Sequence, residues 1–187
     1  MHLGRRRDNQ VGQPEVPVLA RFREMLAEPM NAVRIRCHGD YHLGQLLYTG
    51  RDFVVTDFEG EPLHPLNERR MKRTPLRDVA GMLRSFDYAA HAPLVVAGSG
   101  PAVRPEDQSV LNAWARFWYA HVGAAFLEKY FQTISAQLMP EKPEHARTIL
   151  DCYLLEKAIY EIGYELNNRP EWAIVPLRGV LNLLDGE

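Results

Sequence analysis

Only a few short segments of this chain have β character, and this limits the folds that are open to it. Apolar β-type residues occupy Gln45 to Tyr48 and Phe53 to Asp57, on either side of a glycine-containing turn. Two such runs around a turn predict a β-hairpin. One more alternating run, Val33 to Cys37, predicts a short strand before the hairpin. Most of the remaining apolar residues follow a helical period, so the sequence predicts an α+β domain that is mainly helical.

Proline positions and apolar stripes predict the helix boundaries. Thr74 and Pro75 are typical of a helix start, because a hydroxyl caps the first turn and proline fits its first position. The predicted helices cover residues 19–26, a segment from Thr74 to before His91, and residues 108–137, 144–167 and 176–184. Loops are predicted over residues 59–73 and 91–107, and a loose lead-in over residues 1–18.

Three apolar stripes are predicted to face the core. The first, on the helix that begins at Thr74, consists of Leu76, Val79, Ala80, Leu83 and Phe86. The second, on residues 144–167, consists of Leu155, Ile159, Ile162 and Leu166. On residues 108–137, Trp114 and Trp118 stand four residues apart and are predicted to be core residues.

Composition narrows the class of protein. Of the 187 residues, 46% are apolar and 25% are charged, as in ordinary soluble globular proteins. A net charge of −2 argues against a general nucleic-acid or membrane binder, and no apolar run approaches the roughly 20 residues that span a bilayer. Cys37 and Cys152 lack metal-site spacing and are expected to be reduced thiols of a cytoplasmic protein. We expect residues 33–187 to form one lobe, preceded by a lead-in or linker remnant over residues 1–32.

The residues that point to chemistry surround the hairpin. Asp40 lies in the loop before it, Gln45 begins its first strand, and Asp57 ends its second. Because a hairpin folds back on itself, these three oxygen-bearing side chains are predicted to meet at one edge. Mg²⁺ prefers one or two such protein oxygens together with water and phosphate. The alternative is that both aspartates merely form turns in an ordinary loop.

The same three residues have the spacing that phosphoryl transfer uses. Kinase catalytic loops place an amide five residues after the catalytic Asp, and Gln45 stands five residues after Asp40. The carboxylate orients the attacking hydroxyl, while the amide and a second carboxylate hold Mg²⁺ against the nucleotide phosphates. Asp57, Phe58 and Glu59 stand where protein kinases have Asp-Phe-Gly.

Four segments closely resemble the C-terminal lobe of the maltokinases, including those fused to trehalose synthase. They are HGDYHLGQ at 38–45, DFEGEP at 57–62, ERRMKRTPLRDVAGMLRSFDYAA at 68–90 and EKAIYEIGYELNNRP at 156–170. The resemblance implies a protein-kinase-like (aminoglycoside phosphotransferase-like) fold, ATP and Mg²⁺ as co-substrate and metal, and phosphorylation of maltose to maltose 1-phosphate for α-glucan synthesis. It also implies Asp40 as the catalytic base, Gln45 and Asp57 as ligands of Mg²⁺ and the nucleotide, and His42 in the substrate site.

Other polar residues near these segments keep two interpretations. Glu59 and Glu61 either add negative charge near the metal or hold the loop. The basic run Arg69, Arg70, Lys72 and Arg73 is either a phosphate sensor or a solvated loop. Asp78, in the first turn of its helix, is expected to brace the catalytic loop and to take no part in chemistry.

A second group of candidates lies on the helix 144–167. Lys157, Tyr160, Glu161 and Tyr164 are spaced by three or four residues and share one face. Rings stack on the apolar faces of sugars and charged groups bind hydroxyls, so this face is predicted to bind the sugar. A solvated helix face with a Lys–Glu pair is the alternative. Trp172 either adds to the same pocket or belongs to the core.

Kinases of this type also need an N-terminal lobe that covers the nucleotide, typically about 100 residues or more. Only 37 residues precede His38, and they show no strand-rich pattern. We therefore expect either a fragment, an inactive truncated product, or a chain that acts with a separate lobe. Three functions stay open: maltokinase catalysis in a larger protein, a non-catalytic sugar-binding module, and a kinase for another small molecule such as an aminoglycoside or another sugar.

Overall fold

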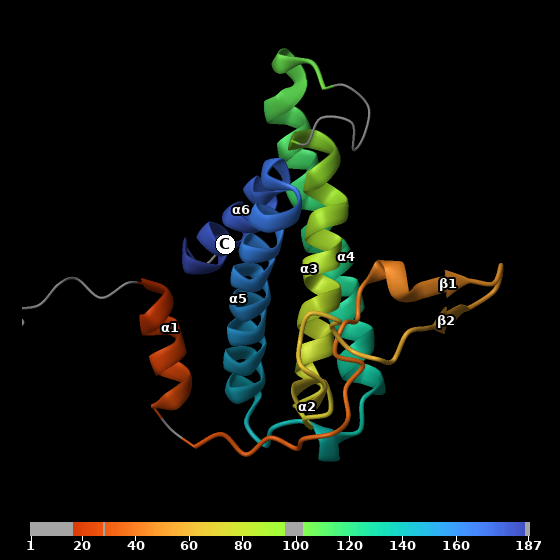
Figure 1. The fold of residues 1–187 in the computed structure, drawn as a ribbon, viewed down its shortest axis with the longest axis vertical. Helices are drawn as coiled ribbons and strands as arrows, with labels where there is room; N and C mark the ends of the chain where they lie inside the picture. The colour runs from red at the N-terminus through yellow and green to blue at the C-terminus, as the bar shows by residue number, and fades with distance from the viewer. Residues whose placement is uncertain (1–16, 28, 96–102, 186–187) are drawn as a thin grey trace, which may run out of the picture.

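Three long helices lie side by side and carry the core of the computed structural model, which describes residues 17–27, 29–95 and 103–185 (Figure 1). They are α3 (Leu76–Val95), α4 (Gln108–Thr133) and α5 (Pro143–Asn168). Helix α3 packs against both others, α6 (Ile174–Asp185) crosses α5 and α3, and α1 (Pro17–Leu26) lies beside α5. None of the described helices combines the length and the apolar character that crossing a bilayer requires.

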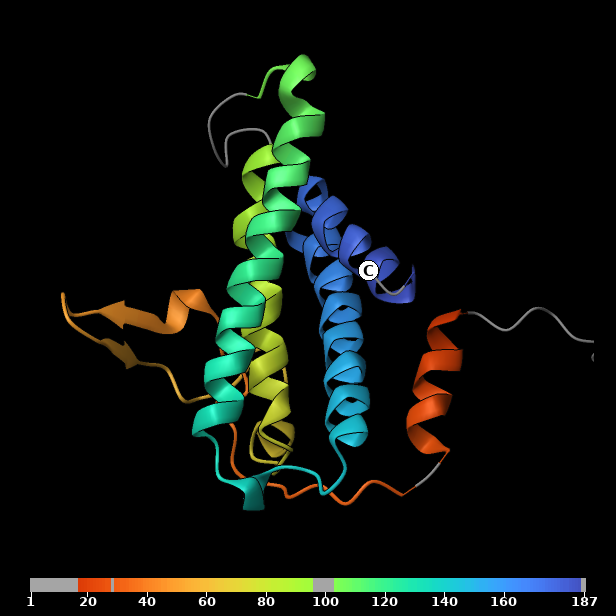
Figure 2. The ribbon, with the colours of Figure 1, turned by 180° about the vertical axis from the view of Figure 1, so that it is seen from behind.

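The predicted β-hairpin is present and projects from the helices, as both views show (Figures 1 and 2). Strands β1 (Leu46–Tyr48) and β2 (Phe53–Val55) are antiparallel, with Leu46 opposite Val55 and Tyr48 opposite Phe53. The predicted strand over residues 33–37 is wrong, because only Ile35 forms a bridge, to Arg73. The pairing cannot continue beyond Arg73, since the chain turns into α3 just after it.

Two predicted loops contain helix. The short α2 (Leu66–Arg69) interrupts the segment 59–73, and α3 runs on to Val95 through the start of the segment 91–107. Pro93 removes one helical hydrogen bond from this last turn. The turn persists because His91 and Ala92 are buried, and Ala92 packs with Val175 of α6. Residues 96–102 of that predicted loop lie outside the described residues.

The predicted core is confirmed on α3 and is wrong in part on α4 and α5. All five stripe residues of α3 are buried, and so is Leu155 on α5. Leu166, by contrast, is 58% exposed and Trp114 is 60% exposed. Helix α5 packs against α3 on one side and α6 on another, so its buried face is broader than one stripe, and it includes Ile149, Leu150, Leu154, Ala158 and Glu165.

A glycine on α3 allows the loop before the hairpin to lie against this helix. A Cβ built on Gly81 would stand 2.7 Å from the carbonyl oxygen of Tyr41, which is closer than real contacts allow. Helix α3 therefore carries glycine where the chain of residues 38–44 passes over it. A Cβ built on Gly163 of α5, by contrast, would have no atom within 4 Å other than those of the adjoining helix backbone.

We expect Gly81→Ala to destabilise the protein by about 1–3 kcal/mol, because the methyl group would push Tyr41 and its loop away from α3. Urea denaturation measures the change. Gly163→Ala is the matched control, since both glycines are helical, and it should be neutral or stabilise by up to about 1 kcal/mol. Equal effects of the two substitutions would contradict the close approach at Gly81.

Candidate functional site

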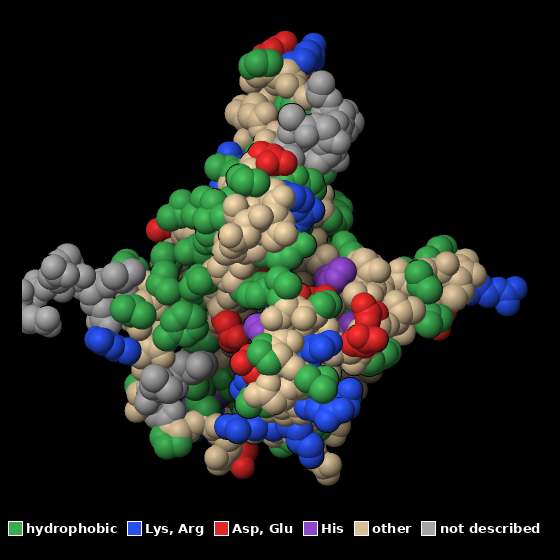
Figure 3. Space-filling view, in the orientation of Figure 1, with side chains coloured by type: hydrophobic (Ala, Val, Ile, Leu, Met, Phe, Trp, Pro, Cys, Tyr) green, Lys and Arg blue, Asp and Glu red, His purple; other side chains and the backbone are tan. Residues whose placement is uncertain are grey.

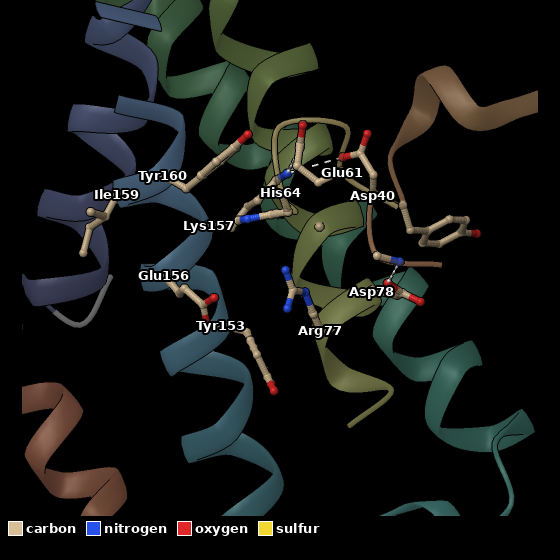
Figure 4. Close-up of a pocket in the computed structure, with 13 residues that line it drawn as sticks. Asp40, Glu61, His64, Arg77, Asp78, Tyr153, Glu156, Lys157, Ile159 and Tyr160 are labelled. Carbon is tan, nitrogen blue, oxygen red and sulfur yellow. Dashed lines mark hydrogen bonds and ion pairs between the residues drawn. The ribbon is translucent and has the colours of Figure 1, made fainter. Parts of the chain in front are cut away.

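The loop that carries Asp40, residues His38–Gly44 (here the HGD loop), is held by the first turn of α3. The Asp78 carboxylate accepts hydrogen bonds from the main-chain N–H groups of His38, at 2.7 Å, and Gly39, at 2.9 Å. Asp78 thus braces the loop, as the sequence led us to expect. Figure 4 shows this contact at the edge of the cavity.

His38 is a second anchor, and sequence reasoning gave it no role. Its Nε2 lies 2.7 Å from the carbonyl oxygen of Thr56, while its Nδ1 lies 3.4 Å from the main-chain N–H of Asp40. The Asp40 N–H can only donate, so Nδ1 accepts and Nε2 carries the proton that it donates to Thr56. The buried ring of His38 thereby ties the HGD loop to the strand that leads into Asp57.

Gln45 and Asp57 meet at the hairpin edge, as predicted. The Gln45 amide Nε2 donates to the Asp57 carboxylate at 3.0 Å. Asp57 has a positive φ of 61°, a conformation that Asp tolerates better than most residues, and it turns the chain away from the strand. This hydrogen bond places the side-chain carbonyl oxygen of Gln45 beside the exposed carboxylate of Asp57. Such a donor set suits Mg²⁺, which takes its other ligands from water and phosphate.

Asp40 contacts a different set of residues. Its carboxylate lies 3.6 Å from His42 Nε2 and 3.4 Å from Lys157 Nζ. Among the described residues no hydrogen bond joins it to Gln45 or Asp57, so only two of the three side chains predicted to converge are in contact. Burial alone would raise the pKa of Asp40, but the hydrogen bond with His42 and the charge of Lys157 outweigh it and lower the pKa to about 2. Asp40 is therefore ionised at neutral pH. The same described residues contain no group of three or more His, Cys, Asp or Glu that could hold a metal ion.

The predicted sugar face of α5 meets the HGD loop across a cavity. One cavity of about 370 Å³, here the acceptor cavity, is lined by Asp40, His42, Lys157, Tyr160, Glu161 and Tyr164, and also by Glu61, Tyr88, Glu165 and Arg169. An adjoining cavity of about 250 Å³ shares Asp40, Glu61, Lys157 and Tyr160 with it (Figure 4). The structure thus brings the predicted base and the predicted sugar-binding residues into one wall.

Lys157 connects the two sides of this wall. Its ammonium lies 3.4 Å from Asp40 Oδ1 and 3.4 Å from Glu61 Oε2, and 5.1 Å from the centre of the Tyr160 ring. Glu61 is therefore fixed by an ion pair, which gives it the role of holding the loop. Glu59 was the other glutamate with two possible roles. Its side chain is 79% exposed and lies 4.0 Å from Arg69.

Glu161 is held from behind by a residue that the sequence analysis missed. Nε and Nη2 of Arg84, on α3, donate to one Glu161 oxygen at 2.9 and 2.7 Å. Arg84 is buried and also binds Asp87, and a Cβ on Gly179 of α6 would lie 2.3 Å from its Nη1. Both hydrogen bonds from Arg84 go to the same oxygen, and Glu161 is part of the lining of the acceptor cavity. Burial raises the pKa of Glu161, and the charge of Arg84 opposes this shift.

A similar pair lies one turn further along α5. Arg169 donates two hydrogen bonds to the buried Glu165, at 2.9 and 2.8 Å, and its guanidinium also lies over the ring of Trp172. The hydroxyl of Tyr88 donates to Glu165 at 3.2 Å. Only the contact between α3 and α5 reveals Arg84 and Tyr88 as partners, since each is 77 residues from the glutamate that it binds, whereas Arg169 and Glu165 are four residues apart. Trp172 itself packs on the Ala92 and Val175 cluster.

Tyr160 places an enclosed hydroxyl at the cavity wall. Its ring stacks on His64 at a centroid distance of 5.4 Å. Burial raises the pKa of this hydroxyl, and the nearby Glu61 carboxylate raises it further. Tyr160 and Glu61 both line the acceptor cavity, where a polar ligand can bind to either group.

Comparison with known proteins places the fold among sugar kinases. No family model matches the chain. The chain is 32% identical over 155 residues to the glucosamine kinase of Streptacidiphilus jiangxiensis, a match that covers 80% of this chain and 32% of that protein. It is also 32% identical over 149 residues to the glucosamine kinase of Mycolicibacterium smegmatis, covering 79% of this chain and 34% of that protein. The chain therefore spans about a third of the length of these curated relatives.

Solved structures agree on the fold. A crystal form of glucosamine kinase superposes with a TM-score of 0.65 at 23% identity, over 90% of this chain and 38% of that one. A glucosamine kinase in complex with glucosamine, ADP and inorganic phosphate superposes with a TM-score of 0.61 at 24% identity, over 90% of this chain and 39% of that one. The predicted kinase-like fold is thus confirmed at the level of a mainly helical domain with a two-stranded sheet. The similar proteins are glucosamine kinases, and no maltokinase is among these matches.

Removing the charge of Lys157 should release the Asp40 carboxyl. We expect Lys157→Met to raise the pKa of Asp40 from about 2 towards its ordinary value, because a neighbouring cation is lost. Carbon-13 NMR titration of the aspartate carboxyls follows the change. Lys129→Met, on the exposed side of α4, is the control and should leave the titration unchanged. An Asp40 titration that does not move in Lys157→Met would show that the ion pair is absent in solution.

Arg84→Met should leave the buried Glu161 carboxylate without its cation. We expect the free energy of unfolding at pH 7 to fall by about 3–5 kcal/mol. Since burial raises the pKa of Glu161 in the folded state, protonation at lower pH relieves the unpaired charge, and the deficit should shrink between pH 7 and pH 5.

Urea denaturation at the two pH values measures this deficit. Arg147→Met is the control, because Arg147 pairs with an exposed Asp151 at 3.9 Å and should contribute less than about 1 kcal/mol. A deficit in Arg84→Met that is the same at both pH values would argue against the assignment to Glu161.

Proposed function

We propose that this chain is the acceptor-binding, catalytic part of an enzyme that transfers the γ-phosphoryl group of ATP to a hydroxyl of a sugar. The observation that carries the proposal is the shared wall of the acceptor cavity, where Asp40 stands next to Lys157 and Tyr160 of α5. The Gln45–Asp57 pair lies at the hairpin edge on the same loop system. The similarity to glucosamine kinases, one of them solved with a sugar and ADP, supports the same reaction class.

In this proposal Asp40 orients the attacking hydroxyl and receives its proton. Because its pKa is about 2, Asp40 is a weak base. Its main contribution is therefore to position the hydroxyl and to stabilise the positive charge that develops on the hydroxyl proton during the transfer. Lys157 and His42 hold the carboxylate in place. Asp57 and the carbonyl oxygen of Gln45 would bind Mg²⁺, which supplies charge neutralisation of the nucleotide phosphates when it is bound.

The charges in the acceptor cavity favour an amino sugar as the acceptor. Four carboxylates line it, from Asp40, Glu61, Glu161 and Glu165. Three cations contact them: Lys157 binds the first two, Arg84 binds Glu161, and Arg169 binds Glu165. One negative charge is left over, and an ammonium group on the sugar would balance it. The relatives named as glucosamine kinases support the same acceptor class.

Maltose is the second candidate acceptor. The motifs at residues 38–45 and 156–170 resemble those of maltokinases, and the rings of Tyr160 and Tyr164 suit the apolar faces of a neutral sugar. Maltose carries no ammonium, however, and leaves the excess carboxylate unpaired. We therefore rank maltose below an amino sugar.

The hairpin favours a further protein partner on the nucleotide side. Tyr48 and Phe53 are 66% and 60% exposed, and Figure 3 shows several apolar side chains on the surface of the projecting hairpin. A lobe that covers ATP would bury these side chains, and the matches cover only 32% and 34% of the curated relatives. We propose that ATP is bound between such a lobe and the Gln45–Asp57 edge.

Acceptor binding tests the substrate class without needing the nucleotide. We expect calorimetric titration of the chain to detect glucosamine, to detect N-acetylglucosamine at least tenfold more weakly because its ammonium is lost, and to rank maltose below glucosamine. Tighter binding of maltose would replace the amino sugar as the proposed acceptor. Absence of heat with all three sugars would contradict the acceptor cavity.

The role of Asp40 needs a polypeptide that also carries a nucleotide-covering lobe. There, Asp40→Asn should lower kcat by about 100-fold or more while the acceptor affinity from calorimetry survives. Asp151→Asn, an exposed carboxyl on α5, is the control and should keep the wild-type rate. Undiminished turnover of Asp40→Asn would remove Asp40 from the reaction.

A further inference from the structure

A small cavity of about 70 Å³ lies next to the HGD loop, on the side of α2, and is unlike the acceptor cavity in charge. Its lining includes three arginines: Arg69 of α2, Arg73 just before α3, and Arg77 of α3. Gly39 and Gly60 also line it. We call it the arginine cavity. Figure 3 shows Lys and Arg side chains gathered over this lower part of the molecule, and two of the three arginines belong to the basic run seen in the sequence.

Two of the three guanidinium groups have unused hydrogen-bonding capacity. Nε of Arg69 and Nε of Arg73 are both enclosed and without a hydrogen-bond partner. Arg69 lies 4.0 Å from the carboxylate of Glu59, and Nη2 of Arg73 lies 3.5 Å from the sulfur of Met71. Arg77 projects from α3 towards α5 in Figure 4 and forms no ion pair with another described residue. Arg84 and Arg169, in contrast, bind carboxylates at 2.7 to 2.9 Å.

The acidic residues around the arginine cavity do not pair with its arginines. Glu61, Glu68 and Glu156 also line it, so the formal charges of the lining balance. Glu61 is bound by Lys157 and Glu68 lies 3.4 Å from Nδ1 of His64, and no ion pair within the described residues joins these glutamates to the three arginines. The cavity therefore holds two enclosed donors, Nε of Arg69 and Nε of Arg73, that lack an acceptor, and leaving them so is unfavourable.

We propose that the arginine cavity binds a phosphate-type oxyanion, either inorganic phosphate or the phosphate group of a sugar phosphate. Guanidinium groups match such an anion with paired N–H donors. Gly39 and Gly60 both have positive φ, and neither carries a side chain that would fill the cavity. The proposal needs no phosphoryl transfer by this chain and can be tested independently of it.

A bound anion would act on the loop that holds Asp40. A Cβ on Gly39 would lie 3.3 Å from Gly60, and a Cβ on Gly60 would lie 3.4 Å from the side chain of Arg69. Gly60 is thus packed between the HGD loop and Arg69. An anion bound to Arg69 and Arg73 would hold the segment of Gly60 and Glu61 against this loop.

The test compares two pairs of substitutions in the same basic run. In wild type, inorganic phosphate in excess should raise Tm by roughly 5 °C over chloride at equal ionic strength. Arg69→Gln with Arg73→Gln should abolish this shift. Arg70→Gln with Lys72→Gln removes the same formal charge from exposed positions outside the cavity and should keep most of it.

Phosphorus-31 NMR on wild-type protein gives a second measurement that does not depend on a variant that folds. The phosphate resonance should broaden with protein and sharpen again when glucose 6-phosphate is added, if the ester binds the same cavity. If the narrow phosphate resonance returns only with excess inorganic phosphate and not with glucose 6-phosphate, the free anion is the ligand. No broadening in wild type, or an equal Tm shift in both double variants, would overturn the proposal.

Discussion

The carboxylate of Asp78 makes the contacts on which the geometry of the site depends. It accepts the main-chain N–H groups of His38 and Gly39 and so places the residues just before Asp40 on the first turn of α3. His38 then extends the connection to Thr56, next to Asp57. Without Asp78, these two N–H groups would lose their acceptor. The HGD loop and the hairpin would then no longer be held in a fixed position on the helices. Gly81 completes the arrangement by allowing close approach to α3.

Ion pairs keep the carboxylates of the acceptor cavity in one arrangement. Lys157 of α5 binds Asp40 and Glu61 of the loops, Arg84 of α3 binds Glu161 of α5, and Arg169, at the end of α5, binds Glu165 one turn before it. Each buried carboxylate is costly alone and tolerable in such a pair. Because Lys157 and Arg84 come from other elements than the carboxylates that they bind, the packing of these elements fixes the carboxylates before any ligand arrives. Preorganised charge of this kind is what a transfer reaction requires.

The substrate inferred from motifs and that favoured by the structure are different. The HGD loop and the α5 segment resemble maltokinases, while the similar proteins are glucosamine kinases and the cavity has one carboxylate more than its cations neutralise. When α5 is considered alone, the rings of Tyr160 and Tyr164 suit the apolar faces of a neutral sugar. Adding Asp40, Glu61 and Glu165 from other turns and loops reverses that balance. The charge of the acceptor that suits the cavity therefore depends on residues from several elements, which only the folded chain brings together.

The sequence by itself determined the hairpin, the start of α3 at Thr74, the core face from Leu76 to Phe86 and the face that joins Lys157 to Tyr164. These follow from local signals: turn glycine, helix cap and helical period. The contact of Gln45 with Asp57 also followed, because a hairpin returns to its own start. What only the tertiary structure decided are the partners. Arg84 meets Glu161 across 77 residues, and Lys157 meets Asp40 across 117. The buried face of α5 and the exposure of Trp114 also depended on which helices pack where, since the helical period on α5 predicted a stripe that includes Leu166, which is 58% exposed.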